Sequence, residues 1–169
     1  MKIFKVSEKA EIPAFATEGS ACFDLRLCID HDSRIRAYNP HNKETYVPVK
    51  VSNQGVNVQI PPSFRVLLPT GLIFDIPKNH VMKIFIRSSM ALKYGLALAN
   101  STAIIDSDYT DPTYVMLTNH SDTPVTLFHG DRIAQAMLEK TESYSLVERK
   151  TAPEQKTSRD GGIGSTGTN

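Results

Sequence analysis

The chain has 169 residues, with 19 basic and 18 acidic side chains and a formal net charge of +1 at pH 7. This length suits one domain with a short tail rather than two domains, because cores of roughly 100 to 150 residues are self-sufficient. The near balance of charge gives no broad electrostatic reason to expect nucleic acid or an anionic membrane as partner. Any anion that the protein binds must therefore be bound by a local cluster of charged or polar groups.

The cysteine content and the hydropathy of the chain indicate the compartment. Cys22 and Cys28 are too few for a disulfide framework, and no group of Cys and His has the spacing of a zinc site. The charged first residues are not followed by an apolar signal segment, and no run of about 18 apolar residues occurs. We therefore expect a soluble intracellular protein of the cytoplasm, with no membrane partner.

The residue types predict an all-β fold. Val, Ile, Thr, Phe and Tyr make up 51 of the 169 residues, and these types fit the pleated, half-buried surface of a sheet. Short apolar or alternating runs recur between turn signals, which is typical of a sandwich or jelly-roll rather than of βαβ units. The expected strands cover residues 20–29, 46–51, 56–60, 65–68, 72–76, 80–86, 103–108, 114–117, 124–127 and 133–138.

Three local patterns stand out between these strands. Residues 46–60 alternate at period two on both sides of an Asn/Gly-containing turn, which predicts a β-hairpin. Residues 31–45 are polar and charged, so an exposed loop is expected there. One short helix is expected around Met90, with Ser88 or Ser89 as its N-cap and Gly95 at its end.

Glycine is concentrated at the C-terminus, where four of the nine glycines lie in the last nine residues. After residue 138 the apolar pattern gives way to mixed charge. We therefore expect residues 1–138 to form one β domain, with an inserted loop and hairpin at about 31–59. Residues 139–169 are expected to form a linker and a flexible glycine-rich arm.

The most informative stretch for chemistry contains two acidic residues. Asp106 and Asp108 end an apolar run, and strand alternation would place both carboxylates on one face. Burial and a neighbouring like charge are how proteins raise the pKa of a carboxyl until it can serve as a general base for water. From the residues alone, solvated Asp side chains at a strand end fit equally well.

Two further segments have the composition of an anion site. Arg87 precedes Ser88 and Ser89 at the expected helix start, and a guanidinium, two hydroxyls and free N–H groups suit a polyanion. A capped helix with a structural arginine explains the same pattern. Residues 130–135 read as a turn entering a strand, with Arg132 and Gln135 as polar exceptions, and a plain hairpin turn is the alternative.

The C-terminal glycines supply backbone N–H groups that side chains do not obstruct. Such a strip can fold over phosphates as a lid, although a disordered tail explains it as well.

In chain order, all these pieces resemble the five motifs of the trimeric dUTPase family, the dUTP pyrophosphatases. The five corresponding segments are residues 20–25, 87–91, 100–109, 130–135 and 159–167. Five short motifs in the right order are far more specific than any one of them.

The resemblance covers the chain from about residue 14 to the C-terminus, and residues 31–59 look longer than the family's usual connection. It implies a distorted jelly-roll or β-sandwich subunit with one short helix, assembled as a homotrimer with active sites between subunits. It also implies magnesium-dependent hydrolysis of dUTP to dUMP and pyrophosphate, which keeps uracil out of DNA and supplies dUMP for dTMP synthesis. The implied cofactor is Mg²⁺, and the implied partners are dUTP and further copies of the chain.

The resemblance also assigns roles to residues. Asp106 would be the general base for the water that attacks the α-phosphorus, and Asp24 would act through water on magnesium-bound phosphates. Tyr109 would pack on the deoxyribose, and Asn100 would lie at the turn that reads uracil. The other implied substrate-binding residues are Arg87, Ser88, Ser89, Ile105 and Gln135 in the body, and Arg159, Gly162, Ile163, Gly164, Ser165 and Thr166 in the lid.

Several positions depart from the family pattern. Cys22 and Ala103 occupy positions where glycine is usual, and Arg159 is one residue closer to the following glycine pair. Ile163 occupies the position of an aromatic residue that stacks on the base, and such stacking contributes about 1 to 3 kcal/mol per base elsewhere. We therefore expect a weaker or differently shaped lid.

Other functions are weighed against this one. A dCTP deaminase shares the fold and an Arg-Ser-Ser stretch, but it needs a Glu in the strand after the third motif, and residues 114–118 contain none. A hydrolase of another, modified deoxypyrimidine triphosphate stays open because Ala103 and Ile163 alter the base pocket. A nucleotide-dependent regulatory protein that acts on a partner protein through residues 31–59 also stays open.

Overall fold

The computed structural model describes residues 1–158 and 161–162 of the chain. Its strands are β1 (Lys2–Lys5), β2 (Phe23–Arg26), β3 (Arg34–Tyr38), β4 (Glu44–Ser52), β5 (Gly55–Ile60), β6 (Arg65–Pro69), β7 (Leu72–Asp75), β8 (His80–Ile86), β9 (Leu96–Leu98), β10 (Ala103–Ile105), β11 (Tyr114–Asn119), β12 (Val125–Phe128) and β13 (Arg132–Lys140). One short helix, α1 (Ser88–Tyr94), follows β8 in this part of the chain.

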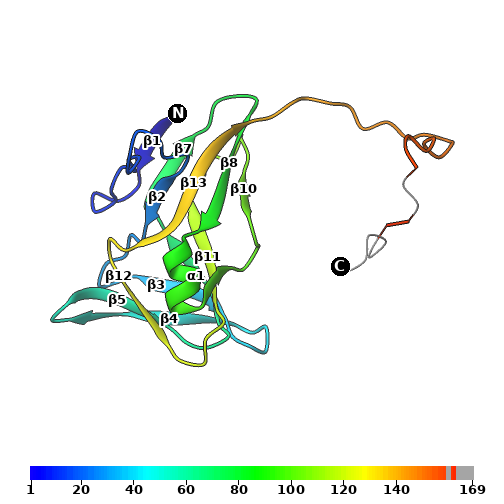
Figure 1. The fold of residues 1–169 in the computed structure, drawn as a ribbon. Helices are drawn as coiled ribbons and strands as arrows, with labels where there is room; N and C mark the ends of the chain where they lie inside the picture. Colours follow the sequence, from blue (N-terminus) through cyan, green and yellow to red (C-terminus); the bar gives the residue numbers. More distant parts are fainter. Residues whose placement is uncertain (159–160, 163–169) are drawn as a thin grey trace.

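The strands form two curled antiparallel sheets and a small ladder. The larger sheet has the order β12-β5-β4-β3-β6-β11-β9, the smaller has the order β10-β8-β13-β2, and β1 pairs with β7. Figure 1 shows the strands of the smaller sheet running across β3, β4 and β5 of the larger one. The prediction of an all-β, jelly-roll-like subunit with one short helix is confirmed.

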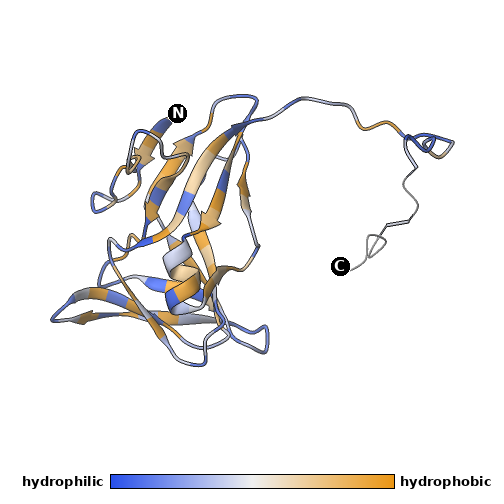
Figure 2. Ribbon diagram, viewed as in Figure 1, coloured by the Kyte–Doolittle hydropathy of each residue, from blue (hydrophilic) through white to orange (hydrophobic). Residues whose placement is uncertain are grey.

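The core lies where the inner faces of the two sheets meet. Alternation points every second side chain of a strand into this interior, and these side chains are mostly apolar. The alternation is visible along the strands in Figure 2. Completely buried side chains come from both sheets, among them Leu25, Ile84 and Ala136 of the smaller sheet and Leu68, Leu117 and Leu127 of the larger. This core fixes the outward faces on which polar residues lie.

The predicted hairpin of residues 46–60 is confirmed, but the loop before it is wrong in part. β4 and β5 pair with Val49 opposite Val58 and Ser52 opposite Gly55, and Gly55 has a φ of 121° that glycine tolerates readily. Within the expected loop of residues 31–45, β3 pairs with both β4 and β6. Only two residues of β3 are buried and apolar, and an alternation this short between two arginines is not recognisable as a strand in the sequence.

The first hairpin, β3–β4, is held by charge as well as by its ladder. The Arg36 guanidinium lies 2.9 Å from the Glu44 carboxylate, and the Tyr38 hydroxyl donates to the same oxygen at 3.1 Å. These hydrogen bonds, Arg36 first, hold the pKa of Glu44 below its ordinary value. The hairpin is therefore an ordered part of the sheet.

The chain leaves the body of the molecule after β13 (Figure 1). Residues 141–158 form no helix or strand, and Tyr144, Leu146 and Val147 are 81 to 91 % exposed there. The division into a β domain at 1–138 and an arm at 139–169 stays a proposal, with β13 itself extending to Lys140. Within the described residues, the structure contains no helix that is long and apolar enough to cross a membrane.

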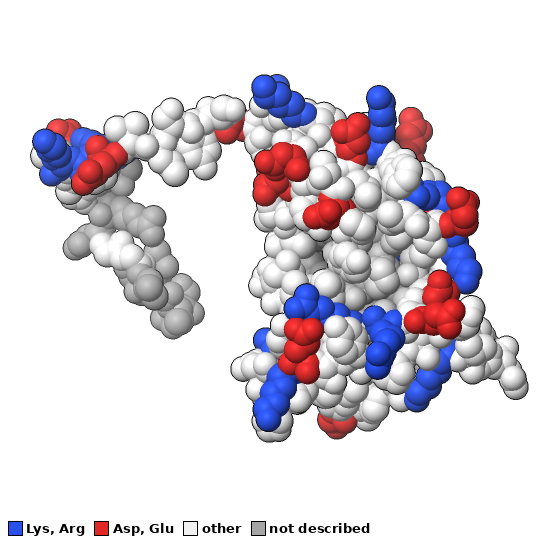
Figure 3. Space-filling view, turned by 180° about the vertical axis from the view of Figure 1, so that it is seen from behind, with Lys and Arg blue, Asp and Glu red and all other residues white. Residues whose placement is uncertain are grey.

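The surface charge is mixed. In Figure 3, basic and acidic side chains lie next to one another on the face opposite that of Figure 1. Alternating signs cancel at distances beyond the screening length of about 8 to 10 Å. Anion binding on this protein therefore depends on short-range contacts in one place.

We predict that Gly71→Ala lowers the free energy of unfolding by about 2 kcal/mol or more. Gly71 has a φ of 70°, and an added Cβ would lie 2.8 Å from both the Ala10 Cβ and the Cys28 Sγ. Gly19→Ala is the matched control, because a Cβ there meets nothing within 4 Å. Denaturant unfolding of both variants checks this, and equal midpoints would contradict the packing described.

Candidate active site

Strand pairing places the first two polar residues of the site side by side. In β2, Phe23 and Leu25 are buried, so alternation turns the Asp24 side chain outward. Asp24 lies opposite Gln135 of β13, and Gln135 lies opposite Phe85 of β8. The Gln135 amide donates to the Ile86 carbonyl at 3.2 Å, which ties it to the end of β8.

A β-bulge in β13 brings a third residue to this face. The register of β13 against β2 shifts between Arg132 and Ala134, and Ile133 and Ala134 are both buried although they are consecutive. One extra residue in a strand reverses the alternation beyond it. Arg132 and Gln135 therefore share a face although they are three residues apart in the sequence.

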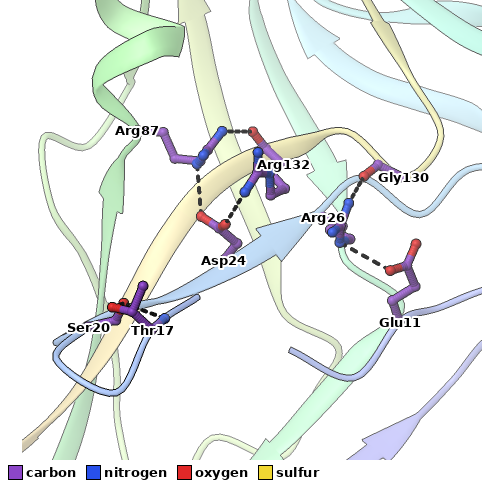
Figure 4. A network of polar contacts seen from close by, with 8 residues as sticks. All are labelled: Glu11, Thr17, Ser20, Asp24, Arg26, Arg87, Gly130 and Arg132. Atoms are coloured by element: carbon purple, nitrogen blue, oxygen red, sulfur yellow. Dashed lines mark hydrogen bonds and ion pairs between the residues drawn. The ribbon is translucent and has the colours of Figure 1, made fainter. Parts of the chain in front are cut away.

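The Asp24 carboxylate lies between two guanidinium groups, as Figure 4 shows. Its Oδ1 is 2.8 Å from the Arg87 Nε, and its Oδ2 is 3.2 Å from the Arg132 Nη1. The Arg87 Nη1 also donates to the Arg132 carbonyl at 3.4 Å. Asp24 and Arg87 are only 22 % exposed, whereas Arg132 is 47 % exposed.

The helix that follows Arg87 starts one residue earlier than a serine cap would require. Arg87 has extended backbone angles and is the N-cap of α1, without a side-chain capping hydrogen bond. Ser88 and Ser89 are the first two helical residues, so the expected serine cap is wrong. The expected end is confirmed, because Gly95 adopts the left-handed conformation with a φ of 63°.

These residues line one hollow of about 360 Å³. Its polar side chains are those of Ser20, Asp24, Arg87, Ser88, Arg132 and Gln135. The half-buried Cys22 lies at its wall, whereas Cys28 is buried in the core. Three segments of the sequence, namely residues 20–25, 87–91 and 130–135, thus meet at one place.

The two acidic residues of the third segment lie elsewhere. Strand β10 ends at Ile105, and Asp106 and Asp108 belong to the turn that follows, with the Tyr109 N–H bonded to the Asp106 carbonyl at 3.2 Å. The prediction that a strand places both carboxylates on one face is therefore wrong. Both are exposed in the single chain, in a hollow of about 610 Å³ that Lys83 and Glu139 also line.

Asn100 and Tyr109 flank this third segment. Asn100 is exposed in the turn between β9 and β10, where Ser101 has a φ of 62° and the Thr102 N–H bonds to the Asn100 carbonyl at 2.7 Å. The Tyr109 hydroxyl donates to the Pro112 carbonyl at 3.1 Å, which fixes a ring that is 38 % exposed. Ile105 is half-buried at the end of β10.

The two groups of site residues lie at opposite ends of β8. Ile105, next to Asp106, is opposite Met82, whereas Arg87 directly follows the last residue of β8. Arg87 is five positions after Met82, which is about 17 Å at the rise of an extended strand. One chain alone therefore does not bring Asp106 to the hollow that holds Arg87.

Most of the expected lid lies outside the described residues, namely Arg159, Ile163, Gly164, Ser165 and Thr166. Gly162 is described and exposed. Arg132 was noted in the sequence only as a polar exception, and its place in the hollow was missed. The sequence signal is that Arg132 is a charged residue three positions before Gln135. Arg132 becomes a site residue only because the bulge turns it to the same face.

Magnesium fits this hollow only together with a substrate. Within residues 1–158 and 161–162, no three His, Cys, Asp or Glu side chains come together as a metal-binding group. Mg²⁺ keeps several waters and is often held by one or two carboxylates plus substrate phosphates. Asp24, the carboxylate among the residues that line the hollow, has the chemistry for that outer contact.

The family model for dUTPase matches residues 51–167 of the chain. The curated deoxyuridine 5'-triphosphate nucleotidohydrolase of Dinoroseobacter shibae is 39 % identical over 95 % of this chain and 90 % of its own length. The chain belongs to the dUTPase family. The predictions of this family and of a dUTP diphosphatase are confirmed.

Solved dUTPases have the same fold. The Staphylococcus bacteriophage 80alpha dUTPase with dUPNHPP has a TM-score of 0.75 at 16 % identity, covering 99 % of this chain and 98 % of the other. A point mutant of the dUTPase from phage phi11 of S. aureus, described with a structural Mg(II) ion, has a TM-score of 0.68 at 14 % identity. It covers 90 % of this chain and 98 % of the other. At these identities the likeness shows the fold.

We predict that Tyr109 ionises at a higher pH than an ordinary tyrosine. Burial, together with the negative charge of Asp111, raises the pKa of its hydroxyl. The pKa of Tyr109 is higher in the folded state than in the unfolded chain. The stability that the neutral hydroxyl gives to the folded state is therefore fully present below the unfolded pKa and is lost as the pH rises through the folded pKa. A titration of ¹³Cζ-tyrosine signals, assigned with Tyr109→Phe, checks the direction. A Tyr109 signal that titrates at or below the ordinary pH would contradict it.

Proposed function

We propose that this dUTPase-family protein hydrolyses dUTP to dUMP and pyrophosphate, with Asp106 as the general base for the attacking water. The attack is on the α-phosphorus, and Arg87, Ser88, Ser89 and Gln135 bind the triphosphate. Preorganised donors aimed at phosphate oxygens stabilise the charge that develops during such an attack. In the cell this activity limits dUTP and supplies dUMP for dTMP synthesis.

The separation of Asp106 from the Arg87 hollow carries the proposal for assembly. A general base has to lie within hydrogen-bond distance of its water, at about 2.6 to 3.2 Å between heavy atoms. The length of β8 prevents one chain from meeting this requirement at a triphosphate bound to Arg87. A homotrimer meets it if one copy supplies Asp106 and Asn100 and the next supplies Asp24, Arg87 and Gln135.

The exposure of Asp106 supports the same assembly. In the single chain the carboxylate is solvated, and nothing excludes water from the base. A neighbouring subunit that covers the hollow beside Asp106 would exclude bulk water, leave room for the attacking water and bring the base to the phosphates. The exposed Ile104, Tyr114 and Met116, between 39 and 52 % accessible, are apolar residues that such an interface would bury.

Magnesium is the proposed cofactor, and it supplies positive charge to the phosphate oxygens when it is bound. Asp24 would contact it through water. Arg87 and Gln135 bind phosphate oxygens directly, and Ser88 donates its hydroxyl. The protein's small net charge makes this local concentration of donors necessary.

Base and sugar recognition are proposed for the third segment. The turn at Asn100, fixed by the left-handed Ser101, presents backbone groups to the edge of uracil. The Tyr109 ring, fixed by its bond to the Pro112 carbonyl, packs on the deoxyribose and leaves no space for a 2′-hydroxyl. Hydrolysis of another deoxypyrimidine triphosphate remains the alternative because of Ala103 and Ile163.

The exposed segment after β13 supports the proposed arm. Tyr144, Leu146 and Val147 are exposed to solvent in the described part of the chain, and apolar residues at this exposure favour contact with another subunit. The arm would carry Arg159 to Thr166 toward a site formed by two other copies. A lid of this kind excludes bulk water from the site while the attacking water stays at the base.

A protein partner at residues 31–59 also remains a proposal. The hairpin β3–β4 borders an outward hollow of about 480 Å³, lined by Arg36, Tyr38, Arg65, Leu67 and Met116 among others. Among the described residues that line it there is no carboxylate, and the Tyr38 hydroxyl donates to the Glu44 carboxylate. A role there would add to the activity rather than replace it.

We predict that the wild type releases pyrophosphate from dUTP in the presence of magnesium and that Asp106→Asn abolishes this release. The amide cannot take the proton from water, whereas it keeps the size of the side chain. Affinity for a non-hydrolysable dUTP analogue is expected to stay within a few-fold of wild type. A pyrophosphate assay and calorimetry check both parts.

A panel of dUTP, dCTP, dTTP and UTP completes the test. Asp108→Asn is the matched control, since it lies in the same turn and hollow. Full activity of Asp106→Asn would remove Asp106 from the role of base. Equal turnover of UTP or ammonia release from dCTP would overturn the substrate.

We predict complementation between two inactive variants, Asp106→Asn and Arg87→Gln. In a mixed trimer, some sites take Asp106 from one chain and Arg87 from the other, so both are intact. Random assembly of equal amounts is expected to restore about a quarter of the wild-type activity, because each intact residue is present with even odds. Co-refolding followed by the pyrophosphate assay measures it. No recovery in verified mixed trimers would show that both residues serve from one chain.

A further inference from the structure

Arg132 is a second guanidinium in the hollow that holds Arg87. Its Nη1 lies 3.2 Å from the Asp24 Oδ2, while Arg87 occupies the Oδ1 of the same carboxylate. Figure 4 shows both arginines converging on Asp24 from different elements, Arg132 from β13 and Arg87 from the start of α1. The roles assigned above to Asp24, Arg87 and Gln135 leave Arg132 without one.

The backbone before Arg132 is firmly fixed. The Gly130 N–H bonds to the Leu27 carbonyl and the Phe128 N–H to the Asp131 carboxylate, both at 2.8 Å. The Arg26 Nη1 donates to the Gly130 carbonyl at 2.7 Å, and the Arg26 Nε pairs with Glu11 at 3.1 Å. This turn and the bulge after it set the position of Arg132 before any ligand arrives.

The charges in the hollow do not balance. Two guanidiniums face one carboxylate, and each guanidinium carries five N–H donors in a planar fork. In the described part of the chain, the polar contacts of these forks use the Arg87 Nε and Nη1 and the Arg132 Nη1. Donors on both arginines, including each Nη2, therefore remain for an anion in the hollow.

We propose that Arg132 is a direct ligand of the polyphosphate chain and that Asp24 is the internal counter-ion of both arginines until that chain arrives. The ligand class is a linear polyphosphate, which has enough anionic oxygens to engage two guanidiniums at once. The inference rests on the proposed function in that it assigns the triphosphate to this hollow. It adds a residue and a competition that the proposed function does not contain.

Competition between Asp24 and the phosphates predicts the direction in which Asp24→Asn changes the affinity for polyphosphate. Phosphate oxygens and the Asp24 carboxylate compete for the same guanidinium donors, so removing the carboxylate favours the phosphates. Asp24→Asn therefore strengthens the binding of a metal-free polyphosphate. The same change lowers magnesium-dependent turnover, because the outer contact to the metal is lost.

The test measures the binding of inorganic tripolyphosphate by calorimetry in EDTA, with the full-length protein. Arg132→Gln is expected to weaken binding about tenfold, the value of one charge-assisted hydrogen bond. Asp24→Asn is expected to strengthen it several-fold, and Asp24→Asn with Arg132→Gln is expected to lose most of that gain. Arg34→Gln, an exposed arginine of β3, is the control and binds as wild type.

Ionic strength separates a direct contact from a structural effect. The difference between wild type and Arg132→Gln is expected to narrow as salt rises, because screening weakens the arginine contact. A difference that is constant in salt, or a folded Arg132→Gln protein that binds as wild type, would overturn the proposal. Arg132→Lys keeps the charge and is expected to retain most of the affinity. If Arg132→Gln does not fold, a Lys variant with no salt-dependent affinity for tripolyphosphate would overturn it too.

Failure of this inference is distinguishable from failure of the proposed function. Binding of tripolyphosphate that depends on Arg132, with no hydrolysis of dUTP by the wild type, would support this site and overturn the activity. Hydrolysis of dUTP together with Arg132-independent binding would do the reverse.

Discussion

The position of β13 between β2 and β8 is the constraint on which the rest of the phosphate hollow depends. Its ladder places Gln135 beside Asp24 on one side and beside Phe85 on the other. The extra residue at Ile133 turns Arg132 to the same outward face. Backbone hydrogen bonds of the sheet therefore decide where the charged groups lie, and the buried apolar side chains on the inner face keep the register from slipping.

The same sheet keeps the base away from the phosphates that it is proposed to act on. β8 pairs with β13 along its whole length, from Ile86 to His80, and β10 pairs with residues 82–84 of β8, so that Asp106 follows β10 at the end of β8 away from Arg87. The two halves of the chemistry are thus fixed to one rigid strand at a separation that no side-chain rotation closes. Assembly of copies, rather than movement within one chain, is the economical way to join them.

The sequence predicted what depends on local pattern. The hairpin at 46–60, the glycine end of α1 and the all-β class follow from alternation and turn chemistry, and all are confirmed. β3 was mistaken for a loop because only Ile35 and Ala37 are buried, and its partners β4 and β6 lie outside any short window. Asp106 was placed in a strand because an apolar run does not show where pairing with β8 stops.

The site shows the same division between local and long-range information. Asp24, Arg87 and Gln135 could be named from motifs, and the structure brings them together. Arg132 could not be ranked above an ordinary turn residue, because a bulge follows from the pairing of two strands rather than from one segment. The lid residues Arg159, Ile163, Gly164, Ser165 and Thr166 and the subunit arrangement remain predictions.

The hairpin β3–β4 belongs to the stretch that was predicted as an inserted loop and hairpin, and it lies inside the larger sheet. β3 covers the edge of β6, and β5, which pairs with β4, is the partner of β12. A shorter connection between residues 30 and 61 would leave β12 unpaired and expose the N–H and C=O groups of β6. Open strand edges pair with other chains and promote aggregation. Residues 31–59 therefore cover strand edges that would otherwise be open. A partner that bound them would contact a part of the protein that the sheet needs for its integrity.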